Sequence, residues 1–173
     1  MDGTVKTKSV GSTTDALSRF DLRSEKARAL ARREPRTVAP ETPLREALAQ
    51  MRAQGGDAVL VTDASDHGRL VGILTERDVL TRVLGVKVDD TRPVSDFMTA
   101  EPHTLAADAT LLEALQAMES GHYRNVPLVD REGQVVGLLR QQDLLEYVAE
   151  AFPQEILNLP PRPHQLMDEP EGA

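Results

Sequence analysis

The chain has 173 residues, of which 40% are hydrophobic and 3% aromatic, and its formal net charge is -8. This length supplies one sizeable core rather than two independent ones, and the lack of cysteine excludes disulfides, thiolate nucleophiles and Cys-ligated metal centres. The acidic charge and the scarcity of aromatic rings make nucleic acid an unfavourable partner.

Residues 1–22 are rich in Gly, Ser, Thr and Asp, and this composition predicts a flexible N-terminal tail. The tail lacks the apolar stretch of a signal peptide, and no run of about eighteen apolar residues occurs in the chain. We therefore expect a cytoplasmic protein that has no membrane contact. Residues 23–35 predict a linker helix, whose basic side chains form a solvated face or a docking surface for an acidic partner.

Residues 36–90 predict five elements in the order strand, helix, strand, strand, helix. The first helix has Thr42 as its cap and Pro43 as its first residue. The two later strands are apolar runs joined by a polar turn, and the last helix is charged. The strands are expected at residues 37–38, 58–62 and 69–74, and the helices from residue 43 and at 76–84.

Residues 91–150 repeat the same order of elements. Nine residues of the first copy recur 67 positions later, and six more recur at an offset of 65, after a two-residue deletion in a turn. A change of length costs little there. In the second copy, Thr110 and Glu113 form a capping-box pattern that opens the helix. The pairs at an offset of 67 are Thr37/Thr104, Ala39/Ala106, Leu44/Leu111, Glu46/Glu113, Ala47/Ala114, Leu48/Leu115, Met51/Met118, Val59/Val126 and Asp63/Asp130.

A single βαββα copy has too little core to be stable alone. We therefore predict an α/β (α+β) fold in which two copies, each with a three-stranded sheet, pack sheet to sheet about a pseudo-twofold axis. The N-terminal helix and tail flank this pair on one side. On the other side, residues 151–173 predict an extended Pro-rich C-terminal tail.

Two motifs accompany the repeat. Residues 72–78 read Gly-Ile-Leu-Thr-Glu-Arg-Asp after a strand, and residues 123–130 read Tyr-Arg-Asn-Val-Pro-Leu-Val-Asp at the entry to a strand. With the doubled pattern, residues 36–150 resemble the tandem CBS (cystathionine β-synthase) domain pair, or Bateman module. The resemblance implies a regulatory module rather than an enzyme, with AMP, ADP or ATP as its ligand and no required cofactor. It also implies a homodimer that signals to an unknown protein partner by conformational change.

The first motif has the chemistry to hold sugar and phosphate. Thr75 lies where a strand becomes a helix, so its hydroxyl and the first free backbone N–H groups can meet an anion. Asp78, one turn later, offers two acceptor oxygens to ribose hydroxyls. The resemblance pairs this motif with base-binding segments of the other repeat, where Arg124 adds charge toward phosphate. The predicted ligand-binding residues are Thr75, Arg77, Asp78, Thr104, Tyr123, Arg124, Asn125, Val126 and Pro127.

The resemblance also implies a second cleft, where the motif differs. Arg140 stands at the position of Thr75, although Asp143 keeps the aspartate. The base side carries Asp57 where the first cleft has Arg124, and an acidic residue there opposes phosphate. We therefore expect two unequal sites. The predicted residues of the second are Thr37, Asp57, Ala58, Val59, Arg140 and Asp143.

Structural alternatives stand beside these assignments. Thr75 and Asp78 are also what a helix N-terminus uses as a cap and as an acidic partner of the dipole. The second copy loses the hydroxyl and keeps Asp143, so capping alone does not explain the shared aspartate. For Arg124, the structural alternative to phosphate binding is a surface ion pair. For the whole chain the alternative is a dimeric protein-interaction module with vestigial clefts, and no Walker, G-x-S-x-G or metal-ligand pattern favours an enzyme.

Overall fold

The structure is a computed structural model that describes residues 22–53, 58–84 and 87–151. The tails predicted at the two ends lie almost entirely outside the described residues, as does Asp57 of the predicted second cleft. Within the described part of the chain, no helix is both long enough and apolar enough to cross a membrane.

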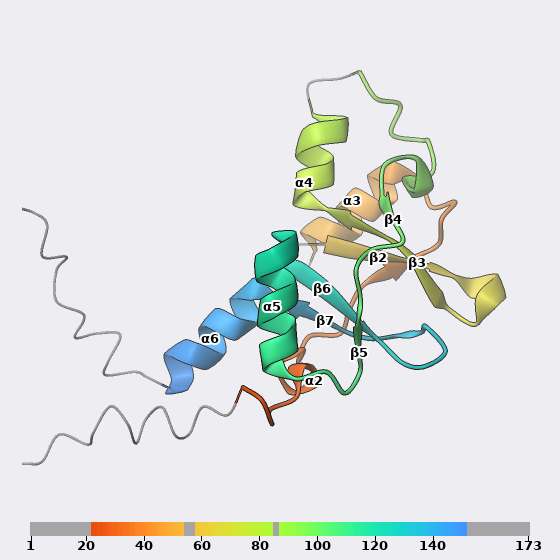
Figure 1. The fold of residues 1–173 in the computed structure, drawn as a ribbon. Helices are drawn as coiled ribbons and strands as arrows, with labels where there is room; N and C mark the ends of the chain where they lie inside the picture. Colours follow the sequence, from red (N-terminus) through yellow and green to blue (C-terminus); the bar gives the residue numbers. More distant parts are fainter. Residues whose placement is uncertain (1–21, 54–57, 85–86, 152–173) are drawn as a thin grey trace, which may run out of the picture.

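The first sheet has four strands in the order β1-β2-β3-β4, of which β1 to β3 belong to the first repeat and β4 to the segment in front of the second (Figure 1). β1 is parallel to β2, while β3 is antiparallel to both β2 and β4. The elements are β1 Thr37–Val38, α3 Leu44–Arg52, β2 Ala58–Asp63, η1 Ala64–Asp66, β3 Arg69–Thr75, α4 Glu76–Asp78, η2 Val79–Val83, η3 Val94–Asp96 and β4 Thr99–Ala100.

The second repeat builds a three-stranded sheet in the order β5-β6-β7, with β5 parallel to β6 and β6 antiparallel to β7. Its first helix opens with the predicted capping box. Thr110 Oγ1 accepts from Glu113 N at 3.2 Å, and Glu113 Oε2 accepts from Thr110 N at 2.7 Å. The elements are β5 Leu105–Ala106, α5 Leu111–Gly121, β6 Asn125–Val129, β7 Val135–Arg140 and α6 Gln141–Ala151.

Three details of the first repeat differ from the sequence prediction. Its sheet has a fourth strand, because β4, from the segment in front of the second repeat, pairs with β3 at the sheet edge. The helix α3 begins at Leu44, and Pro43 is its N-cap rather than its first residue. The charged helix after β3 has only three α-helical residues, and the π-helical segment η2 continues it.

The segment in front of each repeat packs onto the other repeat. α2 (Ala27–Leu30), which is much shorter than the predicted helix over residues 23–35, places both of its end residues in the core of the second repeat. Val94 and Phe97, in and just after η3, join the core of the first repeat. Figure 1 shows α2 near α5 and β7 and away from α3. The division of the chain at residues 90 and 91 remains a prediction.

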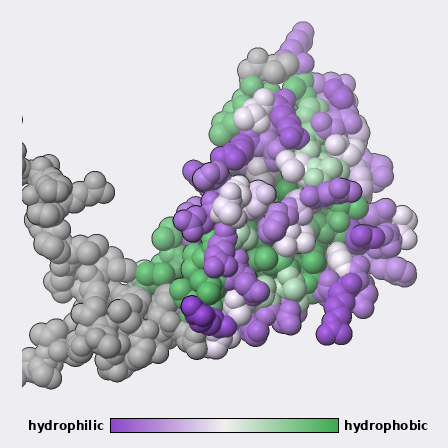
Figure 2. Space-filling model, in the orientation of Figure 1, coloured by the Kyte–Doolittle hydropathy of each residue, from purple (hydrophilic) through white to green (hydrophobic). Residues whose placement is uncertain are grey.

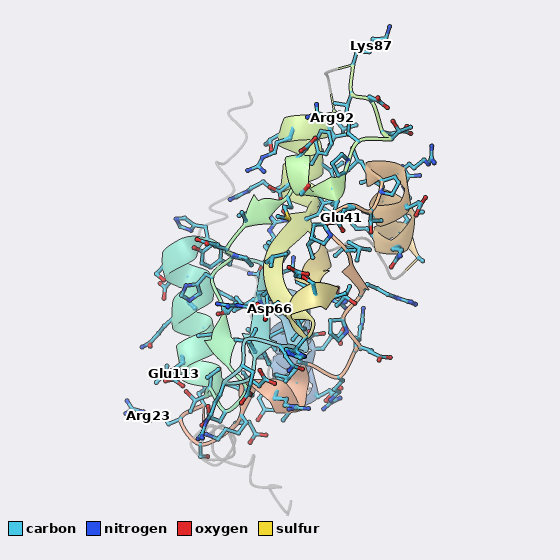
Figure 3. The ribbon with its side chains drawn as sticks, turned by 90° about the vertical axis from the view of Figure 1, so that its right-hand side faces the viewer. Arg23, Glu41, Asp66, Lys87, Arg92 and Glu113 are labelled. Carbon is cyan, nitrogen blue, oxygen red and sulfur yellow. The ribbon has the colours of Figure 1, made fainter. Side chains whose placement is uncertain are left out.

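Two equivalent backbone hydrogen bonds, 67 residues apart, join each of these exchanged segments to the first helix of the other repeat. Leu44 N donates to Arg92 O at 2.8 Å, and Leu111 N donates to Glu25 O at 2.9 Å. A helix leaves its first N–H groups without an intrahelical partner, so the exchanged segments complete the starts of α3 and α5. Figure 3 shows Arg92 and Arg23, which belong to these two segments, toward opposite ends of the molecule.

The two sheets pack against each other through a third apolar cluster. Leu60 and Ile73 of the first sheet meet Leu138 of the second in this cluster. Leu70 N donates to Gly133 O at 3.1 Å, which joins the edges of the two repeats. The predicted sheet-to-sheet packing is confirmed, and it brings the ends of strands from one repeat to face the other.

Candidate functional site

A cleft of about 760 Å³ lies between the two repeats. One side is formed by the end of β3 and the start of the following helix, with Thr75, Arg77 and Asp78. Residues 122–125 and the start of α6 form the other side, and segment 99–103 closes the cleft between them. This volume is typical of sites for small organic ligands.

The side chains of Thr75 and Asp78 form a capping box at the start of α4. Asp78 Oδ2 accepts from Thr75 Oγ1 at 2.6 Å and from Thr75 N at 2.9 Å. In return, Thr75 Oγ1 accepts from Asp78 N at 3.3 Å. Thr75 and Asp78 therefore cap the start of α4, as the structural alternative predicted, and Asp78 is buried. The same pair nevertheless lines the cleft.

The second oxygen of Asp78 is held by residues that the sequence analysis did not assign to the site. Thr99 Oγ1 donates to Asp78 Oδ1 at 2.9 Å, and Arg82 Nη2 lies 3.7 Å from the same oxygen. Arg82 Nη1 also donates to the carbonyl oxygens of Phe97 at 3.0 Å and Met98 at 2.6 Å. A ligand hydroxyl must therefore share the remaining lone pairs of Asp78 or displace one of these donors.

On the opposite side, Tyr123, Arg124 and Asn125 line the cleft as they lead into β6. The ring of Tyr123 stacks on His103, with centroids 5.5 Å apart and an interplanar angle of 15°. A Cβ added at Gly121 would overlap the Tyr123 ring, so glycine leaves the room that this stack needs. His103 belonged to no recognisable motif, and only the fold shows that it lies in the cleft.

The other predicted residues of this cleft lie away from its surface. Val126 and Pro127 are fully buried in β6, behind Asn125. Thr104 is half-buried next to His103. None of these three residues lines the cleft, and their role in a ligand site stays a prediction.

Charges of both signs line the cleft. Its three arginines come from separate elements, one after β3, one before β6 and one at the end of β7. Arg140 is the last of these, although the sequence analysis assigned it to the second cleft. Three carboxylates also line the cleft, so a ligand with both anionic and hydroxyl groups finds matching partners. The charged residues are Arg77, Arg124, Arg140, Glu76, Asp78 and Glu101.

The residues predicted for the second cleft do not come together in one described cavity. Asp143 lines a small cavity of about 110 Å³ beside α2 and α6, together with Arg32 and Arg33. Ala58 and Val59 are buried in β2, Thr37 is exposed in β1, and Asp57 lies outside the described residues.

Asp143 makes one hydrogen bond that corresponds to the capping box, since its Oδ2 accepts from Arg140 N at 2.9 Å. Burial raises the pKa of the Asp143 carboxyl, against the lowering effects of that hydrogen bond and of the charges on Arg140 and Arg33. The equivalent aspartates of the two repeats thus lie in different surroundings.

Residues 27–85 and 94–150 each match the family model of the CBS domain. The chain belongs to the CBS domain family. Both matches begin where the exchanged segments enter the core, at α2 and at η3, and together they form a tandem CBS pair.

Among relatives, the CBS domain-containing protein CBSCBSPB5 of Arabidopsis thaliana is 40% identical over 104 residues, which cover 60% of this chain and 18% of that protein. The chain thus spans about a fifth of the length of this relative. A CBS domain protein from Pyrobaculum aerophilum, solved in complex with AMP, is 23% identical with a TM-score of 0.64, over 72% of this chain and 98% of that one. CBSX2 in complex with AMP is 21% identical with a TM-score of 0.64, over 73% and 97%. At these identities the two structures establish the fold alone.

Proposed function

We propose that this CBS pair is a regulatory module that binds an adenine nucleotide in the cleft between its repeats. One observation carries the proposal: the cleft unites Thr75, Arg77 and Asp78 of the first repeat with Tyr123 and Arg124 of the second. Two proteins of the same fold were solved with AMP, which supports the same class of ligand.

The contacts follow from the chemistry of the two sides. The ribose hydroxyls donate to Asp78, and one of them replaces Thr99 Oγ1 at Asp78 Oδ1. Arg77 and Arg124 attract the phosphate, and the stacked Tyr123 borders the base. The second region, around Asp143, binds weakly or not at all, because its cavity of about 110 Å³ is too small for a nucleotide.

Binding regulates rather than converts the nucleotide. The cleft is built from both repeats, so a ligand that contacts both changes the equilibrium between their relative arrangements. A cytoplasmic partner protein reads that change. The competing function is a protein-interaction module whose clefts are vestigial.

Calorimetric titration of the full chain with AMP, ADP and ATP tests this function, with Arg124→Ala and Arg33→Ala as a matched pair. Both changes remove one partly exposed arginine, but only Arg124 lines the large cleft. We expect the wild type and Arg33→Ala to bind alike, and Arg124→Ala to bind about tenfold more weakly. Undetectable binding of all three nucleotides to the wild type would favour the vestigial-cleft module.

We further propose that the pair forms a homodimer through α4, η2 and α6. Leu80 and Leu145 occupy equivalent positions in the two repeats, and both are 63% exposed. Figure 2 shows hydrophobic surface on the side of the molecule that holds α4 and α6. Light scattering should give twice the chain mass for the wild type and a lower mass for Leu80→Glu, since a charge opposes burial of this surface. A wild-type monomer at all concentrations contradicts the dimer.

A further inference from the structure

The carboxylate of Asp78 lines the cleft, yet both of its oxygens are hydrogen-bonded within the protein. Asp78 is 6% exposed, and its Oδ2 accepts from the backbone and the side chain of Thr75. Its Oδ1 accepts from Thr99 Oγ1 at 2.9 Å, and Arg82 Nη2 lies 3.7 Å from the same atom. A ribose hydroxyl that approaches Asp78 therefore competes with donors of the protein itself.

Thr99 is the donor at Oδ1 that a ligand reaches from the cleft. Thr99 is exposed on β4 and lines the cleft, whereas Arg82 is not part of the cleft lining. The exposed hydroxyl thus covers part of the buried carboxylate of Asp78. Rotation about the Cα–Cβ bond of Thr99 is enough to release Oδ1, because the hydroxyl then donates to water instead.

The backbone that carries Thr99 is held independently of this hydroxyl. On one side, β4 pairs with β3. On the other side, Arg82 Nη1 donates to the carbonyl oxygens of Phe97 at 3.0 Å and Met98 at 2.6 Å. Loss of the bond between Thr99 and Asp78 therefore leaves the strand in place, and only the side chain has to move.

The second repeat shows that the fold does not require a hydroxyl at this position. By the 67-residue offset, the position of Thr99 holds Arg32, whose Nη2 lies 3.9 Å from Glu150 Oε2. The aspartate of that repeat, Asp143, accepts from Arg140 N. The hydroxyl over the carboxylate is thus a feature of the large cleft rather than of the repeat.

We propose that the Thr99 hydroxyl is a built-in competitor of ligand hydroxyls at Asp78 Oδ1, and that it lowers the affinity of the cleft for ribose. This inference rests on the proposed nucleotide site and adds a residue that sets its affinity. A ribose hydroxyl gains a hydrogen bond to Asp78 only when Thr99 loses one, so the exchange is nearly balanced. A nucleotide without ribose hydroxyls leaves the bond from Thr99 intact.

Calorimetric titrations of AMP and 2′,3′-dideoxy-AMP into the full-length wild type and Thr99→Val test this competition. Valine keeps the β-branched shape of threonine and removes the donor. We expect Thr99→Val to bind AMP about tenfold more tightly than the wild type does, because the ribose no longer displaces a donor. The affinity for 2′,3′-dideoxy-AMP should change by less than about twofold, because this ligand does not use Oδ1.

Two further variants serve as matched controls for the ratio of the two dissociation constants. Thr99→Ser keeps the hydroxyl and should retain the wild-type ratio. Thr81→Val makes the same chemical change at another threonine of the cleft, whose hydroxyl donates to Arg77 O at 2.8 Å. That hydroxyl makes no hydrogen bond to the Asp78 carboxylate, so this variant should also retain the ratio.

Thermal melting separates competition from damage to the fold. Without ligand, Thr99→Val should melt at a lower temperature than the wild type, because Asp78 Oδ1 loses a donor. Saturating AMP should close this difference, because the ribose supplies the missing donor in the variant and replaces it in the wild type. Saturating 2′,3′-dideoxy-AMP should leave the difference unchanged.

Two results would overturn the role of Thr99 while leaving the nucleotide site in place. One is an unchanged or weaker affinity of Thr99→Val for AMP. The other is equal tightening of AMP and 2′,3′-dideoxy-AMP, which assigns the gain to apolar contact with valine. Absence of binding of both ligands to the wild type and to Thr99→Val overturns the proposed function together with this inference.

Discussion

The helices that follow β3 and β7 begin with equivalent aspartates in unlike surroundings. Asp78 accepts hydrogen bonds from the backbone and side chain of Thr75 and from Thr99. Asp143 accepts one from Arg140 N, and burial raises the pKa of its carboxyl. Both carboxylates are buried, but Asp78 accepts more hydrogen bonds from the protein than Asp143 does.

Divergence at two positions explains this contrast. Arg140 stands at the position of Thr75 and has no capping hydroxyl, and Arg32 stands at the position of Thr99 by the 67-residue offset. Two neutral donors to the carboxylate in the first repeat are thus replaced by arginines in the second. The duplicated fold tolerates both arrangements, because each aspartate lies at the start of the helix that follows an equivalent strand, β3 or β7.

Asp78→Ala should cause the largest loss of stability among changes at these two helix starts. It removes the carboxylate half of the capping box, which accepts from Thr75 N and Thr75 Oγ1, and it leaves Thr99 without its acceptor. The backbone N–H of residue 78 still donates to Thr75, and we expect the free energy of unfolding to fall by roughly 2–3 kcal/mol. Asp143→Ala loses one backbone hydrogen bond, so it should cost less than about 1 kcal/mol. Urea unfolding of the two variants beside the wild type measures both values. Equal losses would show that the surroundings of the two aspartates do not matter energetically.

Most of the fold follows from the repeat, because both copies place apolar residues at the same spacing. The strand β4 could not be predicted from that pattern, since Thr99 and Ala100 are both exposed and form only two residues of strand. The packing of α2 on the second repeat could not be predicted from the sequence either. Ala27 N bonds to Ala109 O at 2.9 Å, a partner that is distant in sequence and belongs to the other repeat.

The site was predictable to the extent that it rests on motifs. Thr75, Asp78, Tyr123 and Arg124 line one cleft, while their role in ligand binding stays a prediction. The donors to Asp78 Oδ1 come from Thr99 and Arg82, and the side chain that faces Tyr123 comes from His103. These residues reach the site through tertiary packing and follow no local pattern. The same is true of Arg140, which lines the first cleft.

Asp143→Asn should produce a smaller effect of the opposite sign. Since burial raises the pKa of Asp143, the folded protein prefers the neutral carboxyl, and an uncharged amide of the same shape relieves that penalty. It also keeps an oxygen that accepts from Arg140 N. At neutral pH we expect the free energy of unfolding to rise by about 1 kcal/mol, measured by urea unfolding.

The pH dependence of this gain distinguishes it from a change in packing. In the wild type, the raised pKa means that the folded state binds the Asp143 proton more tightly than the unfolded chain does. The contribution of Asp143 to stability therefore falls as the pH rises from the unfolded pKa, about 3.9, to the raised folded value. The advantage of Asp143→Asn should thus be full above that window and disappear below it. An advantage that persists at about pH 3 would assign the effect to packing or to the neighbouring arginines instead.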